Sequence, residues 1–158
     1  MKIDDFPNDV TGWANYLNLF DWYRVCAMKI TFVPSNTAIS NASYRPGYVF
    51  HDPNSITIDN MSENKAISYA NCKIVNTQRK WSYYRKMHRT IAVGASTAAI
   101  RQDGKGYITT DTAVATQCMG MISNQALTAV TTLGRIIITY YIGFKGQRSL
   151  PASTSSKK

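Results

Sequence analysis

The chain has 158 residues, the size of one domain, and this length allows a hydrophobic core without disulfide or metal staples. Its 18 lysines and arginines against 9 aspartates and glutamates give a formal net charge of +9, which favours a polyanion or an anionic surface as partner. No apolar stretch approaches the ~18 residues of a membrane span, and the N-terminus has neither the basic nor the apolar region of a secretory signal. We therefore expect neither a membrane protein nor a protein secreted through a signal peptide.

The cysteines do not predict a disulfide framework or a metal centre. Cys26, Cys72 and Cys118 are odd in number and widely separated, no CxxC is present, and only His51 and His88 could assist them. We expect three buried thiols in a protein of a reducing compartment, with no metal and no cofactor.

The first predicted elements lie before residue 35. Met1–Pro7 is short and polar and ends at a Pro-Asn turn signal, so we expect the chain to begin part-way into a longer protein. Residues 8–18 predict a loop or a short helical turn. Asp21–Pro34 (DWYRVCAMKITFVP) alternates in polarity and predicts a long strand that ends at a proline, which cannot donate to a ladder. Its predicted apolar face consists of Trp22, Cys26, Met28, Ile30 and Phe32, interrupted by Arg24.

The middle of the chain gives weaker signals. Ser35–Gly47 and His51–Asn64 are rich in turn residues and predict loops on either side of a short strand at Tyr48–Phe50. Cys72–Arg85 (CKIVNTQRKWSYYR) is a third strand candidate. Both of its faces carry some polarity, which suits a sheet whose outer face meets another molecule.

Two segments complete the middle region. Thr90–Ala99 is small and β-branched and predicts a fourth strand, followed by a turn at Asp103–Gly104. Residues 106–132 fit either a short helix or two weak strands joined at Gly120.

The strongest pattern lies near the C-terminus. Thr132–Arg148 (TLGRIIITYYIGFKGQR) repeats apolar character at every second residue, which predicts a strand with one dry face. That face consists of Ile136, Ile138, Tyr140, Ile142 and Phe144. A helix is excluded because the apolar positions do not gather on one stripe.

Several strands joined by long connections, without alternating helices, predict an all-β fold: a single jelly-roll antiparallel β-sandwich with long loops. We expect residues 1–148 to form this one domain, with its first strand incomplete or missing. Residues 149–158 are rich in Ser, Thr and Lys and predict a flexible tail.

The basic residues are unevenly placed. The interval between Glu63 and Asp103 contains no acidic residue, and its cations are interleaved with Trp81, Tyr83 and Tyr84. Cations neutralise phosphates and exposed aromatic rings stack on bases, so the interval fits an interface for single-stranded nucleic acid. In the alternative interpretation, Trp81 and Tyr83 belong to the core, and the cations form a solvated rim or pair with acidic residues of a neighbouring subunit.

Catalytic signals are weak. Neither His51 nor His88 lies beside a nucleophile motif, and the Gly-Lys-Gly at 104–106 lacks the rest of a phosphate-binding loop. A hydrolase or lectin-like site around His51, Asp52 and Asp59 remains a third interpretation, although no spacing supports it. We therefore do not expect an enzyme.

Three segments in order resemble the capsid protein of circular Rep-encoding single-stranded DNA viruses, the circovirus-like group. They are FDWYRVCAMKITFVP at Phe20–Pro34, RKWSYYR at Arg79–Arg85 and ITYYIGFKGQR at Ile138–Arg148. The resemblance extends from about Phe6 to Arg148. Members of the family usually begin with an Arg-rich arm followed by a first strand, whereas Met1 here is near the expected end of that strand, which is a departure from the family's pattern.

The resemblance implies a structural subunit of an icosahedral, self-assembling shell, commonly a T=1 shell of 60 copies, around circular single-stranded DNA. It implies a place in the virion, and in the host nucleus or cytoplasm during assembly. The alternative is a non-viral single-stranded nucleic-acid-binding β-domain that acts as a monomer or small oligomer.

These interpretations assign residues to two roles. The residues predicted to contact nucleic acid are Lys73, Arg79, Lys80, Arg85, Lys86 and Arg89, with Trp81 and Tyr83 as stacking platforms. The residues predicted to contact other subunits are Trp13, Tyr16, Leu17 and Phe20.

Overall fold

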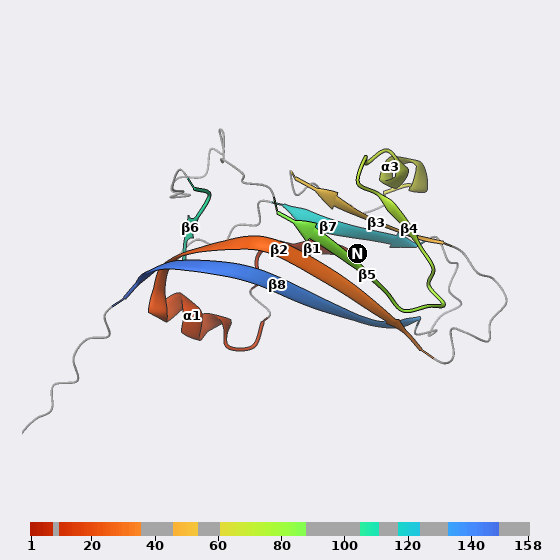
Figure 1. Ribbon diagram of the computed structural model, residues 1–158. Coiled ribbons are helices and arrows are strands. Elements are labelled where there is room, and N and C mark those ends of the chain that lie inside the picture. The colour runs from red at the N-terminus through yellow and green to blue at the C-terminus, as the bar shows by residue number, and fades with distance from the viewer. Residues whose placement is uncertain are drawn as a thin grey trace, which may run out of the picture.

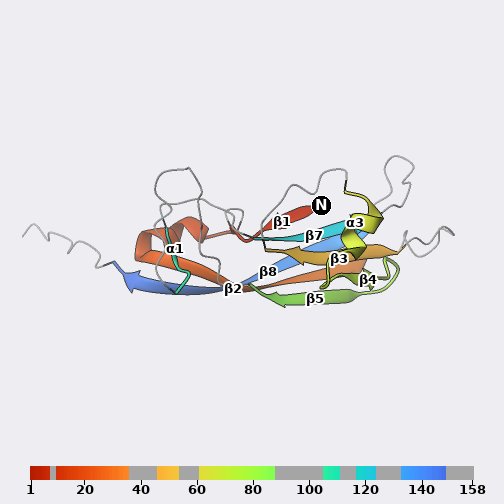
Figure 2. The same cartoon turned by 90° about the horizontal axis from the view of Figure 1, so that it is seen from above.

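The computed structural model describes residues 1–7, 10–35, 46–53, 61–87, 105–110, 117–123 and 133–148. Two antiparallel β-sheets pack face to face in this part of the chain (Figures 1 and 2). The first sheet has the order β1 (Lys2–Asp4), β7 (Cys118–Ser123), β3 (Gly47–Asp52) and β4 (Lys73–Val75). The second contains β5 (Trp81–Lys86), β2 (Phe20–Pro34), β6 (Ile108–Thr109) and β8 (Gly134–Gln147). Two short helices accompany them, α1 (Trp13–Leu19) and α3 (Glu63–Ile67).

The long pair β2–β8 is the centre of the second sheet. Its register runs from Phe20 opposite Gln147 to Pro34 opposite Gly134. β5 and β6 pair with the other edge of β2, at its two ends. Both long strands were predicted from their alternation, and their bounds agree with the prediction to within two residues.

A β-bulge corrects the predicted apolar face of β2. The register shifts between Val25 and Ala27, so the strand changes parity there. Tyr23 and Val25 are buried before the shift, and Met28, Ile30 and Phe32 after it. Trp22 therefore lies on the opposite face from Met28, and Cys26 is exposed.

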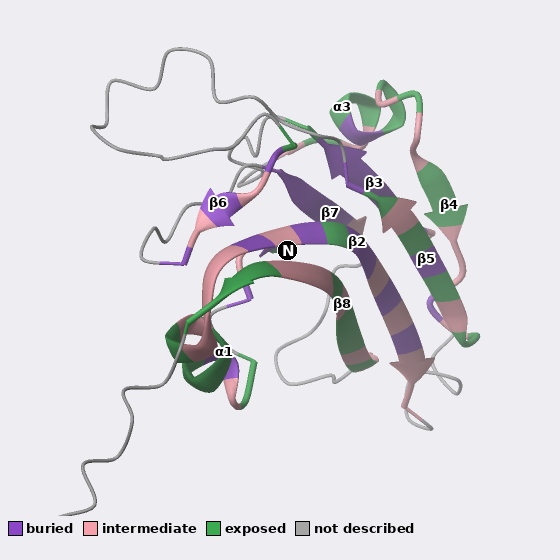
Figure 3. Ribbon diagram, turned by 60° about the vertical axis from the view of Figure 1, so that its left-hand side comes forward, coloured by how far each residue is buried: buried purple, intermediate pink, exposed green. Residues whose placement is uncertain are grey.

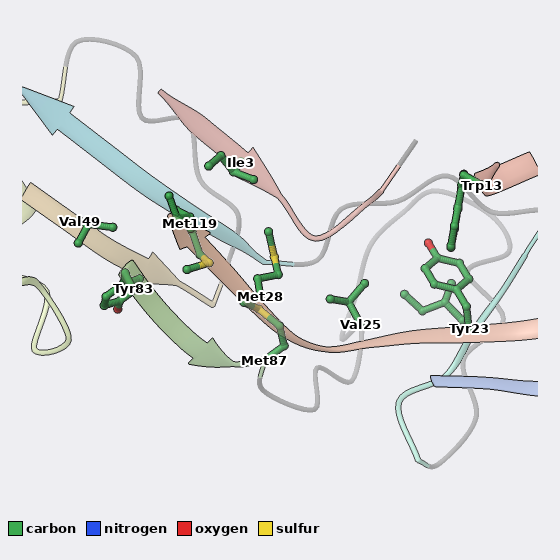
Figure 4. Packing of buried hydrophobic residues seen from close by; sticks show 11 residues of the cluster. Ile3, Trp13, Tyr23, Val25, Met28, Val49, Tyr83, Met87 and Met119 are labelled. Atoms are coloured by element: carbon green, nitrogen blue, oxygen red, sulfur yellow. The ribbon is translucent and has the colours of Figure 1, made fainter. Parts of the chain in front are cut away.

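The main core lies between the two sheets. Met28 and Ile30 of β2, Val49 of β3 and Met119 of β7 are fully buried there. Figure 4 shows Met28 pointing from β2 toward Met119 and Ile3 of the opposite sheet. On β8 the predicted dry face is half-buried against this core, except for Ile138, which is 40% exposed.

The outer face of the first sheet is covered as well. All six residues of β3 are buried (Figure 3), because Tyr48 and Phe50 on its outer side pack against Ala66 of α3 and its neighbours. The Phe50 ring stacks on Tyr69 with centroids 4.5 Å apart. Residues 61–72 thus form a lid over β3.

A polar network is buried within the same sheet. His51 is fully buried, and its Nε2 atom lies 3.0 Å from Oε1 of Gln117. The backbone N–H of Gln117 donates to the Asp5 carboxylate at 3.1 Å. Tyr69 Oη donates to the buried Asp52 carboxylate at 2.7 Å. His51 is therefore a packed residue of the sheet, and the described residues contain no cluster of three metal-ligating side chains.

The structure corrects two other predictions. Cys72–Arg85 is not one strand: β4 and β5 belong to different sheets, and the turn between them includes an Asn76 side chain that accepts from Gln78 N–H. Gly120 lies inside β7 rather than at a join between strands. The predicted strand Thr90–Ala99 and the predicted tail 149–158 lie outside the described residues.

The thiols also differ from the prediction. Cys118 is buried, Cys72 is half-buried and Cys26 is exposed at the bulge, and none of the three forms a disulfide. In the described ranges, no helix has the length and apolar character needed to cross a bilayer.

Candidate nucleic-acid interface

The predicted basic residues follow the connection between the two sheets instead of sharing one face. Lys73 is exposed at the start of β4, and Arg79 and Lys80 are exposed in the turn before β5. Lys86 is exposed on β5, whereas Arg85 alternates to the inner side and is half-buried. Arg89 lies outside the described residues. Four of the predicted cations are therefore exposed along β4, the turn and β5: Lys73, Arg79, Lys80 and Lys86.

Tyr83 has the opposite orientation from the one that base stacking needs. It is 3% exposed, packs in the core between the sheets, and donates from Oη to the backbone oxygen of Asn71 at 3.1 Å. Burial raises the pKa of its hydroxyl. Lys73 Nζ lies 5.8 Å from the centroid of its ring. Tyr83 is therefore a core residue, as in the alternative interpretation of its sequence.

Trp81 is also engaged within the chain. It is half-buried against the core and stacks on Phe32 of β2, with centroids 5.6 Å apart and an interplanar angle of 19°. One face of its ring is therefore already occupied.

The predicted subunit-contact residues divide into core and surface. Trp13 is 5% exposed and packs edge-on against Tyr23 with centroids 5.1 Å apart, so it belongs to the core. Leu17 is half-buried against the same cluster, and Phe20 stacks on Phe144 at 4.9 Å. Tyr16 is 47% exposed although it also stacks on Phe144, at 5.2 Å. Tyr16 alone among the four offers a large exposed ring.

A cation–π cluster that the sequence did not suggest covers one end of the second sheet. Lys145 Nζ of β8 lies 5.3 Å from the Trp22 ring centroid and 5.4 Å from that of Tyr107. Arg24 Nη1 donates to the backbone oxygen of Lys105 at 3.0 Å. The Tyr107 hydroxyl lies 3.1 Å from the place of a Cβ on Gly143, so a larger residue there would press on this ring. Residues 105–107 are thereby held over the outer face at this end.

Two exposed tyrosines of the second sheet were not predicted as contact residues. Tyr84 is 50% exposed and Tyr141 is 45% exposed. Strict alternation contained the signal, since Tyr84 must point away from the buried Tyr83 and Tyr141 away from the half-buried Tyr140. For β8 the dry face was predicted, which leaves Tyr141 on the outer side, whereas for β5 alternation left open which face is dry.

The architecture is that of the jelly-roll coat proteins of small viruses, and solved structures of this class are similar over nearly the whole chain. The giant freshwater prawn Macrobrachium rosenbergii nodavirus particle matches with a TM-score of 0.62 at 12% identity, covering 96% of this chain and 81% of that one. A T=1 subviral particle of a Penaeus vannamei nodavirus capsid protein deletion mutant matches with 0.55 at 14%, covering 94% and 83%. Mud crab tombus-like virus matches with 0.59 at 12%, covering 96% and 78%. At these identities the likeness concerns the fold.

A family model for the circovirus capsid protein matches residues 1–148, and the chain belongs to that family. A comparison with curated proteins found no match. The resemblance noted in the sequence and the all-β jelly-roll prediction are both confirmed. The protein is therefore a structural subunit of a viral shell and a component of the virion, and its role is not enzymatic.

Proposed function

We propose that this chain assembles into a T=1 icosahedral shell of 60 copies that encloses a circular single-stranded DNA genome. The observation that carries the proposal is membership of the circovirus capsid family over residues 1–148. A closed shell needs repeated self-contact, and a sandwich with long connections supplies many surfaces for it. Assembly takes place in the host nucleus or cytoplasm.

The charge of the chain supports an anionic cargo. A net charge of +9 per subunit makes an empty shell of many copies self-repelling, and a packaged polyanion relieves that repulsion. Family membership favours the shell over the alternative of a monomeric nucleic-acid-binding domain, because a binding domain requires no closed assembly.

Electron microscopy of the purified chain at two salt concentrations, with the ratio of absorbance at 260 and 280 nm, tests the proposal. We expect round particles of one diameter that reconstruct with icosahedral symmetry and 60 subunits, a raised absorbance ratio, and cargo that is digested by DNase after the particles are opened. Cargo sensitive only to RNase contradicts the DNA assignment, and a larger triangulation number contradicts the T=1 assignment. Small species alone contradict the shell.

The predicted basic cluster belongs to the same test. Alanine at Lys73, Arg79, Lys80, Arg85, Lys86 and Arg89 is expected to lower the encapsidated nucleic acid and to flatten the salt dependence of binding, by roughly 0.7 in log–log slope per lost contact with a single strand. Unchanged packaging by this variant would remove the cluster from the interface.

A further inference from the structure

The outer face of the second sheet combines exposed aromatic rings with exposed cations. This face is formed by the residues of β5, β2 and β8 that alternate with the core residues. Beyond the cluster around Tyr107 it consists of Ser82, Tyr84 and Lys86 on β5, Ala27, Lys29, Thr31 and Val33 on β2, and Arg135, Ile137, Thr139 and Tyr141 on β8. We call these residues the open face.

The two outer faces of the sandwich differ. Residues 61–72 cover the first sheet at β3, where all six residues are buried. On the second sheet, residues 105–107 cover the end around Trp22 and Gly143. In Figure 3 β5 and β8 carry exposed residues along their length, whereas β3 is buried throughout. Within the described residues, no element covers the open face.

The open face has one sign of charge. Lys86 and Arg135 are exposed and Lys29 is half-exposed, one on each of the three strands. The acidic residues among the described positions lie elsewhere: Asp4, Asp5, Asp52 and Glu63 belong to the first sheet and its lid, and Asp21 binds Arg148 at 2.7 Å at the far end of β2. A polyanion is thus electrostatically matched to this face, and an identical copy of the same cationic face is not.

The tyrosines form a stacking platform. The rings of Tyr84 and Tyr141 lie 5.7 Å apart at 81°, an edge-to-face pair, although they come from strands on opposite sides of β2. They meet because the intervening residue opposite Tyr141 is Ala27, whose methyl group is too small to separate them. Each ring retains about half of its surface for a planar partner. Lys29 lies directly opposite Tyr84 in the register, so a cation is adjacent to the platform.

We propose that the open face binds single-stranded nucleic acid, with bases stacked on Tyr84 and Tyr141 and phosphates held by Lys29 and Lys86. The inference rests on the proposed function, a shell around single-stranded nucleic acid, and it deepens that function by assigning this sheet to the genome-facing side of the subunit. Stacking and phosphate contacts of this kind tolerate any sequence, as packaging of a whole genome requires.

Binding of a fluorescent 20-nucleotide oligothymidylate to the full chain tests the proposal. Tyr84→Ala/Tyr141→Ala is expected to weaken binding by roughly tenfold to a hundredfold, since stacking contributes ~1–3 kcal/mol per base. The matched control Tyr84→Phe/Tyr141→Phe keeps both rings and is expected to bind like the original chain. Lys29→Ala is expected to lower the log–log salt slope by roughly 0.7, whereas Lys65→Ala on α3, above the other sheet, leaves the slope unchanged.

The possible outcomes separate the inference from the proposed function. If the folded alanine variants bind the oligonucleotide and package cargo like the original chain, the inference is wrong. The proposed shell and its cargo are unaffected by that result. Folded variants that keep oligonucleotide binding but lose particles also overturn it, because the open face is then a contact between copies. An original chain that forms particles yet binds no nucleic acid overturns the cargo and the inference together. If the double alanine variant does not fold, Tyr84→Ala alone and Lys29→Glu are measured in its place, with the same losses expected.

Discussion

At the scale of single residues, an aromatic ring leaves no room for a side chain at Gly120. Gly120 on β7 is opposite Phe50 on β3, and a Cβ at Gly120 would overlap the Phe50 ring. That ring cannot retreat freely because its other face stacks on Tyr69. We expect Gly120→Ala to lower the free energy of unfolding by ~1–3 kcal/mol through overpacking.

Urea denaturation of the purified chain measures this effect. Phe50→Leu in the Gly120→Ala background provides the control, since a smaller side chain relieves the overlap and the two changes should be non-additive. Equal midpoints for Gly120→Ala and the original chain would contradict the proposed packing.

We expect ionisation of Tyr69 to lower the stability of the folded chain at alkaline pH. Burial, and then its hydrogen bond to Asp52, raise the pKa of the Tyr69 hydroxyl to about 12 from its ordinary value of 10.0. Between these pH values the unfolded chain loses this proton and the folded chain retains it, so the stability from Tyr69 is fully present below pH 10 and declines as pH rises toward 12.

Tyr69→Phe isolates this contribution. At pH 8 the variant is expected to be less stable by ~1–2 kcal/mol, because the buried Asp52 carboxylate loses a donor. Above pH 10 its stability should decline less steeply than that of the original chain, since phenylalanine cannot ionise. Parallel urea-denaturation curves for the two proteins from pH 8 to pH 11 would show that Tyr69 does not titrate as described.

At the scale of elements, α1 combines a core anchor with an exposed ring. Trp13 at its first position is buried against Tyr23, and Tyr16 one turn later is exposed. Figure 4 shows the Trp13 ring directed at Tyr23. We expect Trp13→Ala to cost ~3–5 kcal/mol of folding stability, and Tyr16→Ala to cost at most about 1 kcal/mol while reducing particle formation.

Thermal unfolding and size-exclusion chromatography of both variants separate the two roles. Exposed Ala14→Ser on the same helix serves as the control and should change neither measurement. A Tyr16→Ala variant that assembles as readily as the original chain would remove α1 from the subunit interface.

At the scale of the whole molecule, the sandwich has two unlike outer surfaces. The first sheet is covered by residues 61–72 at β3, and the second sheet presents tyrosines and lysines. A shell subunit has an inside and an outside, so this asymmetry defines an orientation that can be tested without an atomic structure of the particle. The open face is expected to be shielded from external protease and labelling reagents in intact particles.

Much of this architecture was predictable because β-strands repeat every second residue. That period identified β2 and β8, together with the dry face of β8. It failed at Cys26, where a bulge reverses the parity without any Gly or Pro to mark it. The same period also predicted one strand where β4 and β5 are separate. The turn between them, which includes the Asn76 side chain, resembles a polar strand when only residue types are considered.

The candidate site was less predictable for a related reason. Alternation separates Tyr83 from Tyr84 but does not say which of them faces the other sheet. That choice depends on Met28, Ile30 and the strands across the core, which are distant in sequence. Positive charge directed attention to the interval between Glu63 and Asp103, and tertiary packing decided which aromatic rings remain exposed.

The pairing of the chain's beginning with its end has a consequence for when the protein becomes functional. β1 pairs with β7 and β2 pairs with β8, so neither sheet is complete until the last strands exist. During synthesis on the ribosome the early strands therefore have unpaired edges. Pairing between strands that are distant in sequence makes folding slow. A partly synthesised subunit lacks both the finished core and the three-stranded surface with Tyr84 and Tyr141. We therefore expect chains that stop before β8 to lack the surface needed for assembly.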